Sequence, residues 1–325
     1  MGVLTYNRFM YSTVAILKNS KHSGKLVGTH QKIDKIARKC LSRFFLRVDS
    51  RGHNDDEKTE RLARKMARVA FLPDDRQASS SIFMHKRNDM ERYYFPTAKE
   101  ILYFEGSRGP DGIKRKSPGV DEPSHFIIPE KSETHPHLLG MINDHMYNLT
   151  KALKDGNDVR AAFEAAWLAH ALTDGLTPAH HFPLKEAASE LMSDKEFIKF
   201  FGAPIKGIMR GEDFLETVRN NWRYWGTNGY MSKHIAFEYG VAIVVTAIPN
   251  AELVPILTKD DFAKINVEQE FLRAMYKIHR LDMYNRFRMN GWSAKLARET
   301  TDILIPEIIR VVTLAWTKCI EEANG

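Results

Sequence analysis

Apolar side chains recur at helical spacing through most of this 325-residue chain. In residues 31–47, for example, Ile33, Ile36, Ala37, Cys40 and Leu41 fall on one face, as the 3.6-residue period of a helix requires. Similar patterns predict a series of helices, which are listed here by residue number: 31–47, 57–72, 137–154, 158–174, 185–203, 212–223, 232–247, 259–283 and 293–322. Sustained alternation typical of strands is absent from the sequence. The pattern predicts an all-α, multi-helix bundle.

Two stretches interrupt the helical pattern in a way that matters for function. Residues 105–135 are rich in Gly and Pro, so we expect a long irregular segment there, and long ordered loops commonly carry functional side chains. The sequence WRYWGTNGY, at residues 222–230, is expected to form an aromatic loop.

Two pairs of polar residues stand inside apolar helical runs. His170 and Asp174 are four residues apart, and so are His234 and Glu238, so each pair projects from one face of its helix. Imidazole and carboxylate are ligands of catalytic Zn²⁺. Pro178 follows the first pair, and a turn there can bring His180 back towards the same region. A simple hydrogen-bonded His–acid pair is the alternative interpretation of each pair.

The amino-acid composition bears on which side chains could bind a metal. The chain has 13 His but only two Cys, Cys40 and Cys319, which lie far apart in apolar patterns. A Cys-zinc site or a disulfide framework is therefore not supported.

Residues 1–100 carry 21 basic and 11 acidic side chains, which would attract a polyanion such as nucleic acid or an anionic lipid surface. A solvated basic surface explains the same charge.

The sequence contains no apolar run long enough for a transmembrane helix. The apolar stretch at residues 9–17 is interrupted by Tyr11, Ser12 and Thr13, and no small-residue cleavage pattern follows it. We therefore expect a soluble chain without a signal peptide, and we favour the cytoplasm over secretion while localisation stays open.

Further candidate ligands lie upstream of the two pairs. The irregular segment contains Asp111 and, fourteen residues later, His125 within Ser124-His125-Phe126. His30 stands at the start of the first clear helix.

Taken together, these residues resemble the superfamily of zinc-dependent phospholipases C and single-strand-specific zinc nucleases. That family has the motif His-x3-Asp-x5-His with Pro two residues before the last His, matched here by His170, Asp174, Pro178 and His180. It also has an Asp fourteen residues before a His, a downstream His-x3-acid pair, and a His near the start of the first helix. The resemblance covers about residues 28–245. It implies an N-terminal extension over residues 1–27 and one α-helical domain over 28–325, with insertions near 48–104 and 185–230.

The resemblance also implies a cluster of zinc ions that binds a phosphodiester substrate. Its ligands would be divided as follows: Asp111, His125, His170 and Asp174 for one ion; His180, His234 and Glu238 for a second; His30 and the bridging Asp174 for a third. Metal-activated water would attack phosphorus while the ions neutralise the developing charge. Asp111 would act as the catalytic carboxylate that orients or deprotonates this water.

The chain departs from the family pattern in two places. The third family ion also uses the amino terminus of the mature chain, whereas His30 is internal, so we expect two ions and leave the third open. The gap between His180 and His234 is longer than in the family. Its aromatic residues Trp222, Trp225 and Tyr230 are candidate substrate-binding residues that would stack on a base or surround a choline-like cation, or they pack in the interior.

Three functions remain open from the sequence. The first is a phospholipase C-like hydrolase of phospholipids, and the second is a nuclease that cleaves single-stranded nucleic acid on the same scaffold. The third is a non-catalytic helical protein with a structural metal site. Oligomeric state is not indicated by the sequence.

Overall fold

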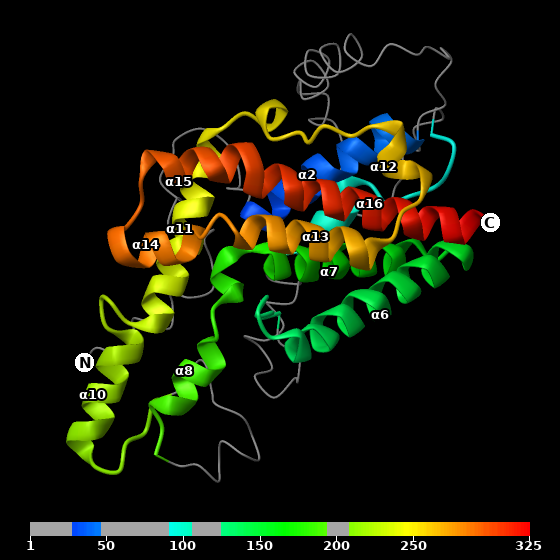
Figure 1. The fold of residues 1–325 in the computed structure, drawn as a ribbon. Coiled ribbons are helices and arrows are strands. Elements are labelled where there is room, and N and C mark those ends of the chain that lie inside the picture. The colour runs from blue at the N-terminus through cyan, green and yellow to red at the C-terminus, as the bar shows by residue number, and fades with distance from the viewer. Residues whose placement is uncertain (1–27, 47–90, 106–124, 194–207) are drawn as a thin grey trace.

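The structure is a computed structural model that describes residues 28–46, 91–105, 125–193 and 208–325. These residues are largely helical and contain no β-strand, so the all-α prediction is confirmed for them (Figure 1). The phospholipase C and nuclease type of bundle stays a prediction. The helices of eight or more residues are α2 (Thr29–Leu41), α6 (His135–Lys154), α7 (Asp158–Leu176), α10 (Phe214–Trp225), α11 (Tyr230–Ala247), α13 (Val267–His279), α14 (Met283–Asn290) and α16 (Ile305–Asn324).

Shorter helical segments connect these elements. They are α4 (Ala98–Tyr103), α8 (Leu184–Glu190), α12 (Lys259–Ala263), α15 (Ala294–Glu299), the 3₁₀ turns η4 (Ser132–Thr134), η5 (Pro178–His181) and η6 (Asn250–Glu252), and the π-helical turns η1 (Ser42–Leu46) and η7 (Thr300–Leu304).

Helices α6 and α7, both predicted from the sequence, form an antiparallel pair. The chain reverses at Gly156, whose φ of 64° is left-handed and therefore suits glycine. Asn157 then caps α7, because its side-chain oxygen accepts a hydrogen bond from the backbone N–H of Arg160. This pair gives the ligand-bearing helix α7 a fixed position.

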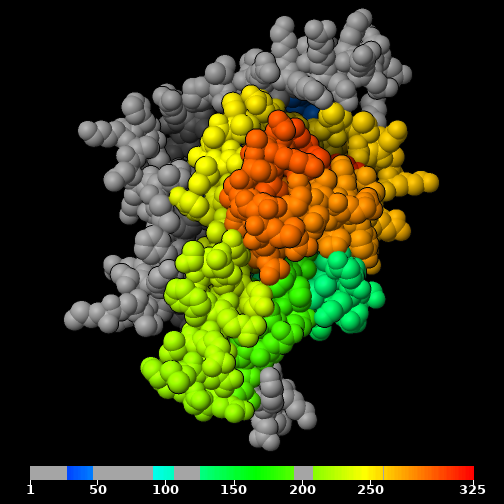
Figure 2. All heavy atoms as spheres, turned by 60° about the vertical axis from the view of Figure 1, so that its left-hand side comes forward, coloured from blue at the N-terminus to red at the C-terminus, as the bar shows by residue number. Residues whose placement is uncertain are grey.

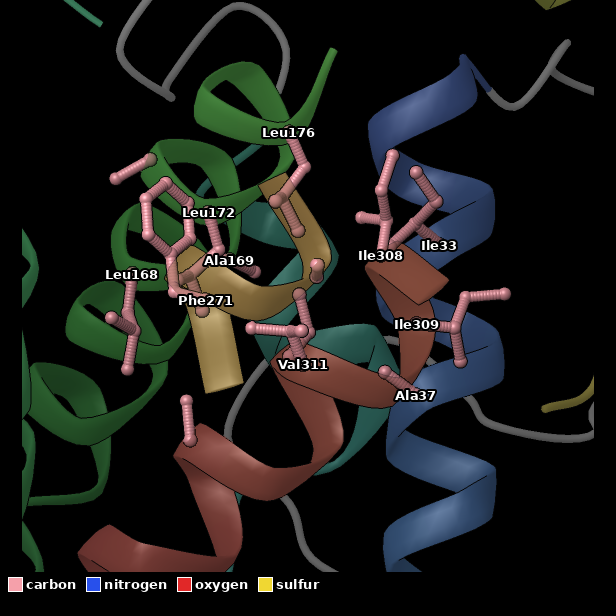
Figure 3. Packing of buried hydrophobic residues seen from close by; sticks show 14 of the residues in the cluster. Ile33, Ala37, Leu168, Ala169, Leu172, Leu176, Phe271, Ile308, Ile309 and Val311 are labelled. Carbon is pink, nitrogen blue, oxygen red and sulfur yellow. The ribbon is translucent and has the colours of Figure 1, made fainter. Parts of the chain in front are cut away.

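The main apolar core lies between α16 and the helices α2, α6, α7 and α13. Figure 3 shows Ile33 of α2, Leu172 of α7, Phe271 of α13 and Ile308 of α16 among its side chains. The indole N–H of the fully buried Trp316 donates to the backbone oxygen of Ala165 at 3.1 Å, which satisfies the polar atom of a core tryptophan. Because α2 and α7 share this core, their ligand-bearing ends are held together.

A second, smaller apolar cluster joins α8, α10 and α11. Its buried members are Leu184, Ala188, Leu191, Met192, Met209, Tyr224 and Met231. Phe126 packs against this cluster from the segment that carries His125. The described residues of α8, α10 and the start of α11 thus share an apolar centre of their own.

The observed elements differ from the predicted ones in several places. Within the described part of the helix predicted over 185–203, the helix ends at Glu190. The helix predicted over 259–283 is interrupted at residues 264–266, because the side chain of Asn266 accepts from the N–H of Gln269 and starts a new helix, α13. Trp222 and Trp225 belong to α10 and not to a loop, which is confined to residues 226–229. The short helices α4 and α14 were not predicted.

The helix predicted over 57–72 and residues 106–124 of the irregular segment lie outside the described residues. The predicted division into an extension, a single domain and insertions stays a prediction. None of the described helices combines the length and apolar character needed to cross a membrane.

Candidate metal centre

Helix α7 supplies the centre of the site. His170 and Asp174 lie one helical turn apart among buried Ala and Leu residues, and the Nε2 of His170 is 3.2 Å from Asp174 Oδ2. The small side chains around them let α2 approach α7 closely. His30, in the first turn of α2, places its Nε2 3.2 Å from Asp174 Oδ1, and its ring stacks on that of His170 at 4.3 Å between centroids.

His125 reaches the same carboxylate from a non-helical segment. Its Nδ1 lies 2.6 Å from Asp174 Oδ2. The backbone N–H of Ile127 donates to the carbonyl of His180, and a ring nitrogen of His135 lies 3.2 Å from the carbonyl oxygen of Ile128. These contacts fix the segment between η5 and the start of α6. We call His30, His125, His170 and Asp174 the Asp174 group.

A second set of ligands, which we call the Glu238 group, consists of His180, His234 and Glu238. The Nε2 atoms of His180 and His234 lie 2.9 and 3.0 Å from Glu238 Oε1. His180 comes from η5 and the other two residues come from α11. Phe126 stacks on the His180 ring at 4.7 Å, which covers one side of this group.

The two groups are neighbours. His180 Nε2 is 4.0 Å from Asp174 Oδ1, so the Glu238 group borders the carboxylate of the Asp174 group. In the described part of the chain, the ion-pair partners of Asp174 and Glu238 are histidines, with no Lys or Arg among them. A site that concentrates imidazole and carboxylate without a permanent cation is suited to bind a metal ion.

Electrostatics keep the carboxylates ionised. Burial alone would raise the pKa of Asp174, but His170, His180 and His30 outweigh it and hold that pKa well below its usual range. Burial lowers the pKa of His170, yet the charges of Asp174 and Glu105 raise it well above the ordinary value. A bound cation would replace the protons on these imidazoles, so metal binding and proton release are coupled.

The side chains present fit metal ions. His30, His170 and Asp174 offer ligand atoms within 4.8 Å of one another, and so do His180, His234 and Glu238. His170 Nε2, a buried ring nitrogen that faces Asp174, forms no hydrogen bond of good geometry with the described residues. Such atoms are rare in folded proteins unless a ligand or water satisfies them. Two groups could therefore hold metal ions, and zinc as their identity stays a prediction.

Sequence reasoning missed two buried carboxylates behind His170. Glu105 Oε2 lies 3.7 Å from His170 Nδ1, on the ring edge away from Asp174. Asp34 is 1% exposed, and neither of its oxygens has a hydrogen-bond partner among the described residues. Burial, together with the charge of Glu105, raises the pKa of Asp34 well above its usual range. The signal was available, because His30 and Asp34 have the same four-residue spacing as the other two pairs.

The remaining predicted site residues are placed as follows. Asp111, the predicted catalytic carboxylate, lies outside the described residues. Trp222 is exposed on α10, whereas Trp225 and Tyr230 are partly buried, and Tyr230 stacks on Phe182 with 5.7 Å between centroids. The substrate-binding role of these three residues stays a prediction.

Comparisons with protein-family models, curated proteins and solved structures found no match to this chain.

Proposed function

We propose that this protein is a zinc-dependent phosphodiester hydrolase of the phospholipase C type. The observation that carries the proposal is the shared carboxylate of Asp174. Its Oδ2 faces His125 and His170, while its Oδ1 faces His30 and, at 4.0 Å, His180. A carboxylate whose two oxygens both face candidate histidine ligands can bridge metal ions. Clustered ions are a common means of stabilising phosphoryl transfer.

The residues have separable roles in this proposal. The Asp174 group and the Glu238 group would each hold an ion, which would supply a Lewis acid and lower the pKa of bound water. Asp174 would set the distance between the two groups. The charge of Glu105, whose Oε2 lies 3.7 Å from Nδ1 of His170, would favour a proton on that nitrogen and so leave Nε2 free to bind an ion. Phe126 would keep water from the covered side of the Glu238 group.

The first test is elemental analysis of the purified protein together with hydrolysis of bis-(p-nitrophenyl) phosphate. We expect two zinc ions per chain, one for each ligand group, and hydrolysis that a chelator abolishes. Asp174→Asn should lower hydrolysis by more than about 100-fold, because even residues that only orient a ligand cost about 10–100-fold when mutated. Asp144→Asn is the matched control, since Asp144 is exposed on α6.

Each other outcome has a definite meaning. Full hydrolysis by Asp174→Asn would refute the proposal. Zinc binding without hydrolysis, with loss of helical signal on chelation, would identify a structural metal site instead. Cleavage of single-stranded DNA without cleavage of phospholipid would replace the lipid substrate by nucleic acid.

A further inference from the structure

Helix α10 presents a row of large apolar side chains to solvent. Phe214, Val218 and Trp222 follow one another at four-residue spacing and are 78%, 51% and 72% exposed. Leu215, beside this row, is 71% exposed. Figure 2 shows the α10 segment, in yellow-green, at the lower edge of this face of the molecule. Folded monomers rarely gather side chains of this size on an exposed patch unless it binds something.

The opposite side of α10 explains why the row points outward. Tyr224 is fully buried in the small apolar cluster with residues of α8 and α11, and Asn220 is buried as well. The helix is therefore anchored by its inner face. We call Phe214, Leu215, Val218 and Trp222 the outer face of α10.

Two arginines lie beside the outer face of α10, and acidic side chains lie at the start of the helix. Arg219 and Arg223 continue the row that begins with Leu215, and both are exposed. Neither forms an ion pair with any described residue. The acidic side chains at the start of the helix are turned to the backbone, because Asp213 accepts from the N–H of Glu216, and Glu216 accepts from the N–H of Glu212. The arginines thus remain available to phosphate groups.

We propose that the outer face of α10 docks on the surface of a phospholipid bilayer. Phe214, Val218 and Trp222 would enter the boundary between headgroups and acyl chains, and Arg219 and Arg223 would contact lipid phosphates. An apolar row beside arginines is the pattern of helices that lie in this boundary, where Trp is also enriched.

The position of α10 relates this surface to the candidate metal centre. α10 packs against α11, and α11 carries His234 and Glu238 (Figure 1). A bilayer that contacts the outer face of α10 would therefore lie one helix away from the element that carries two ligands of the Glu238 group. The preference for lipid over another apolar partner rests on the proposed function. Binding of the outer face of α10 to a bilayer requires no hydrolysis.

The test is co-sedimentation of the full chain, in the presence of a chelator, with vesicles of phosphatidylcholine and phosphatidylglycerol. We expect binding that falls at least tenfold in the double variant Phe214→Ser, Val218→Ser. Arg219→Gln with Arg223→Gln should weaken binding to these vesicles more than to pure phosphatidylcholine vesicles. Tyr147→Ser is the matched control, because Tyr147 is 70% exposed on α6, outside this face. Brominated lipids should quench tryptophan fluorescence, and Trp222→Phe should remove that quenching.

Unchanged vesicle binding by the double serine variant would overturn the proposal. So would a chain that ignores vesicles and instead forms a dimer that the same variant dissociates. Hydrolysis of bis-(p-nitrophenyl) phosphate, a soluble diester, should be unaffected by Phe214→Ser, Val218→Ser. Vesicle binding by a chain that hydrolyses no diester would refute the proposed function and leave the docking surface intact.

Discussion

Two adjacent histidines in η5 have opposite environments. His180 faces Glu238, whereas His181 turns to the protein interior and its Nε2 donates to the carbonyl of Gly175 at 3.0 Å. Burial lowers the pKa of His181 to about 3, so this ring is neutral in the folded protein. Its neutral N–H fixes the end of α7 to η5 and thereby positions the neighbouring His180.

The burial of neutral His181 predicts that this residue makes the unfolding free energy depend on pH. Between pH 6.5 and about 3 the unfolded chain binds a proton that the folded chain does not, so this contribution to stability is present above pH 6.5 and is lost as pH falls. The difference in unfolding free energy between wild type and His181→Gln should grow with pH, by at most about 1.4 kcal/mol per pH unit within that window. Urea titrations of the metal-free proteins at several pH values measure it, and a constant difference would contradict the assignment.

At the scale of elements, α11 is positioned by a close contact at Gly240. A Cβ atom built there would lie 1.7 Å from Nε1 of Trp292, which stacks on Phe237 of the same helix. The indole therefore occupies the space that any side chain at this position would need. Because Glu238 is only two residues away, the contact also fixes the ligand-bearing turn of α11.

Gly240→Ala should consequently displace Trp292 or α11. We expect a loss of about 1–3 kcal/mol of stability, as is usual for overpacking, and weaker metal binding by the Glu238 group. Gly140→Ala is the control, because a Cβ at Gly140 in α6 meets nothing within 4 Å. It should be neutral or stabilising by up to about 1 kcal/mol, since Ala favours helix over Gly. Thermal unfolding and zinc titration of both variants separate the two effects.

On the scale of the whole molecule, the candidate ligands tie together parts of the chain that are distant in sequence. α2 supplies His30, α7 supplies His170 and Asp174, and α11 supplies His234 and Glu238. His125 and His180 complete the two groups from the connecting segments. Without a cation these buried imidazoles and carboxylates rely on one another, so bound ions would stabilise the arrangement of three helices.

We therefore expect metal to raise the melting temperature of the whole chain. A ligand that binds only the folded state at 100 times its dissociation constant adds about 2.7 kcal/mol. Chelation should lower the melting temperature, zinc should restore it in a concentration-dependent manner, and Asp174→Asn should reduce the gain. Scanning calorimetry with and without zinc measures this, and equal melting temperatures in both conditions would argue against ions at these groups.

Much of this arrangement follows from sequence periodicity. The helical pattern predicted α6, α7 and α11 within a few residues of their observed ends. The four-residue spacing placed His170 beside Asp174 and His234 beside Glu238, because this spacing is a local property of a helix. His180, which a turn after Pro178 was expected to bring back towards His170 and Asp174, lies with its Nε2 4.0 Å from Asp174 Oδ1, while its role as a ligand stays a prediction.

Features that depend on tertiary packing were harder to predict from the sequence. The four-residue spacing of His30 and Asp34 is visible in the sequence, but the burial of Asp34 and Glu105 beside His170 depends on the packing of α2, α4 and α7, which sequence alone does not report. The exposure of Trp222 depends on which side of α10 the small apolar cluster occupies. The break before α13 was signalled weakly, since one Asn cap competes with an otherwise continuous apolar pattern.

The dispersal of the ligands has a consequence for biosynthesis. His30 leaves the ribosome long before Asp174 and Glu238 exist, and α16, which packs on α2, α6 and α7, is translated after all of them. Until residue 238 has been made, a nascent chain thus offers an incomplete set of ligands, and the helix that packs on α2, α6 and α7 follows later still. We therefore expect metal acquisition to follow translation, so that the supply of zinc to finished chains, and not the rate of synthesis, would set how much protein is loaded.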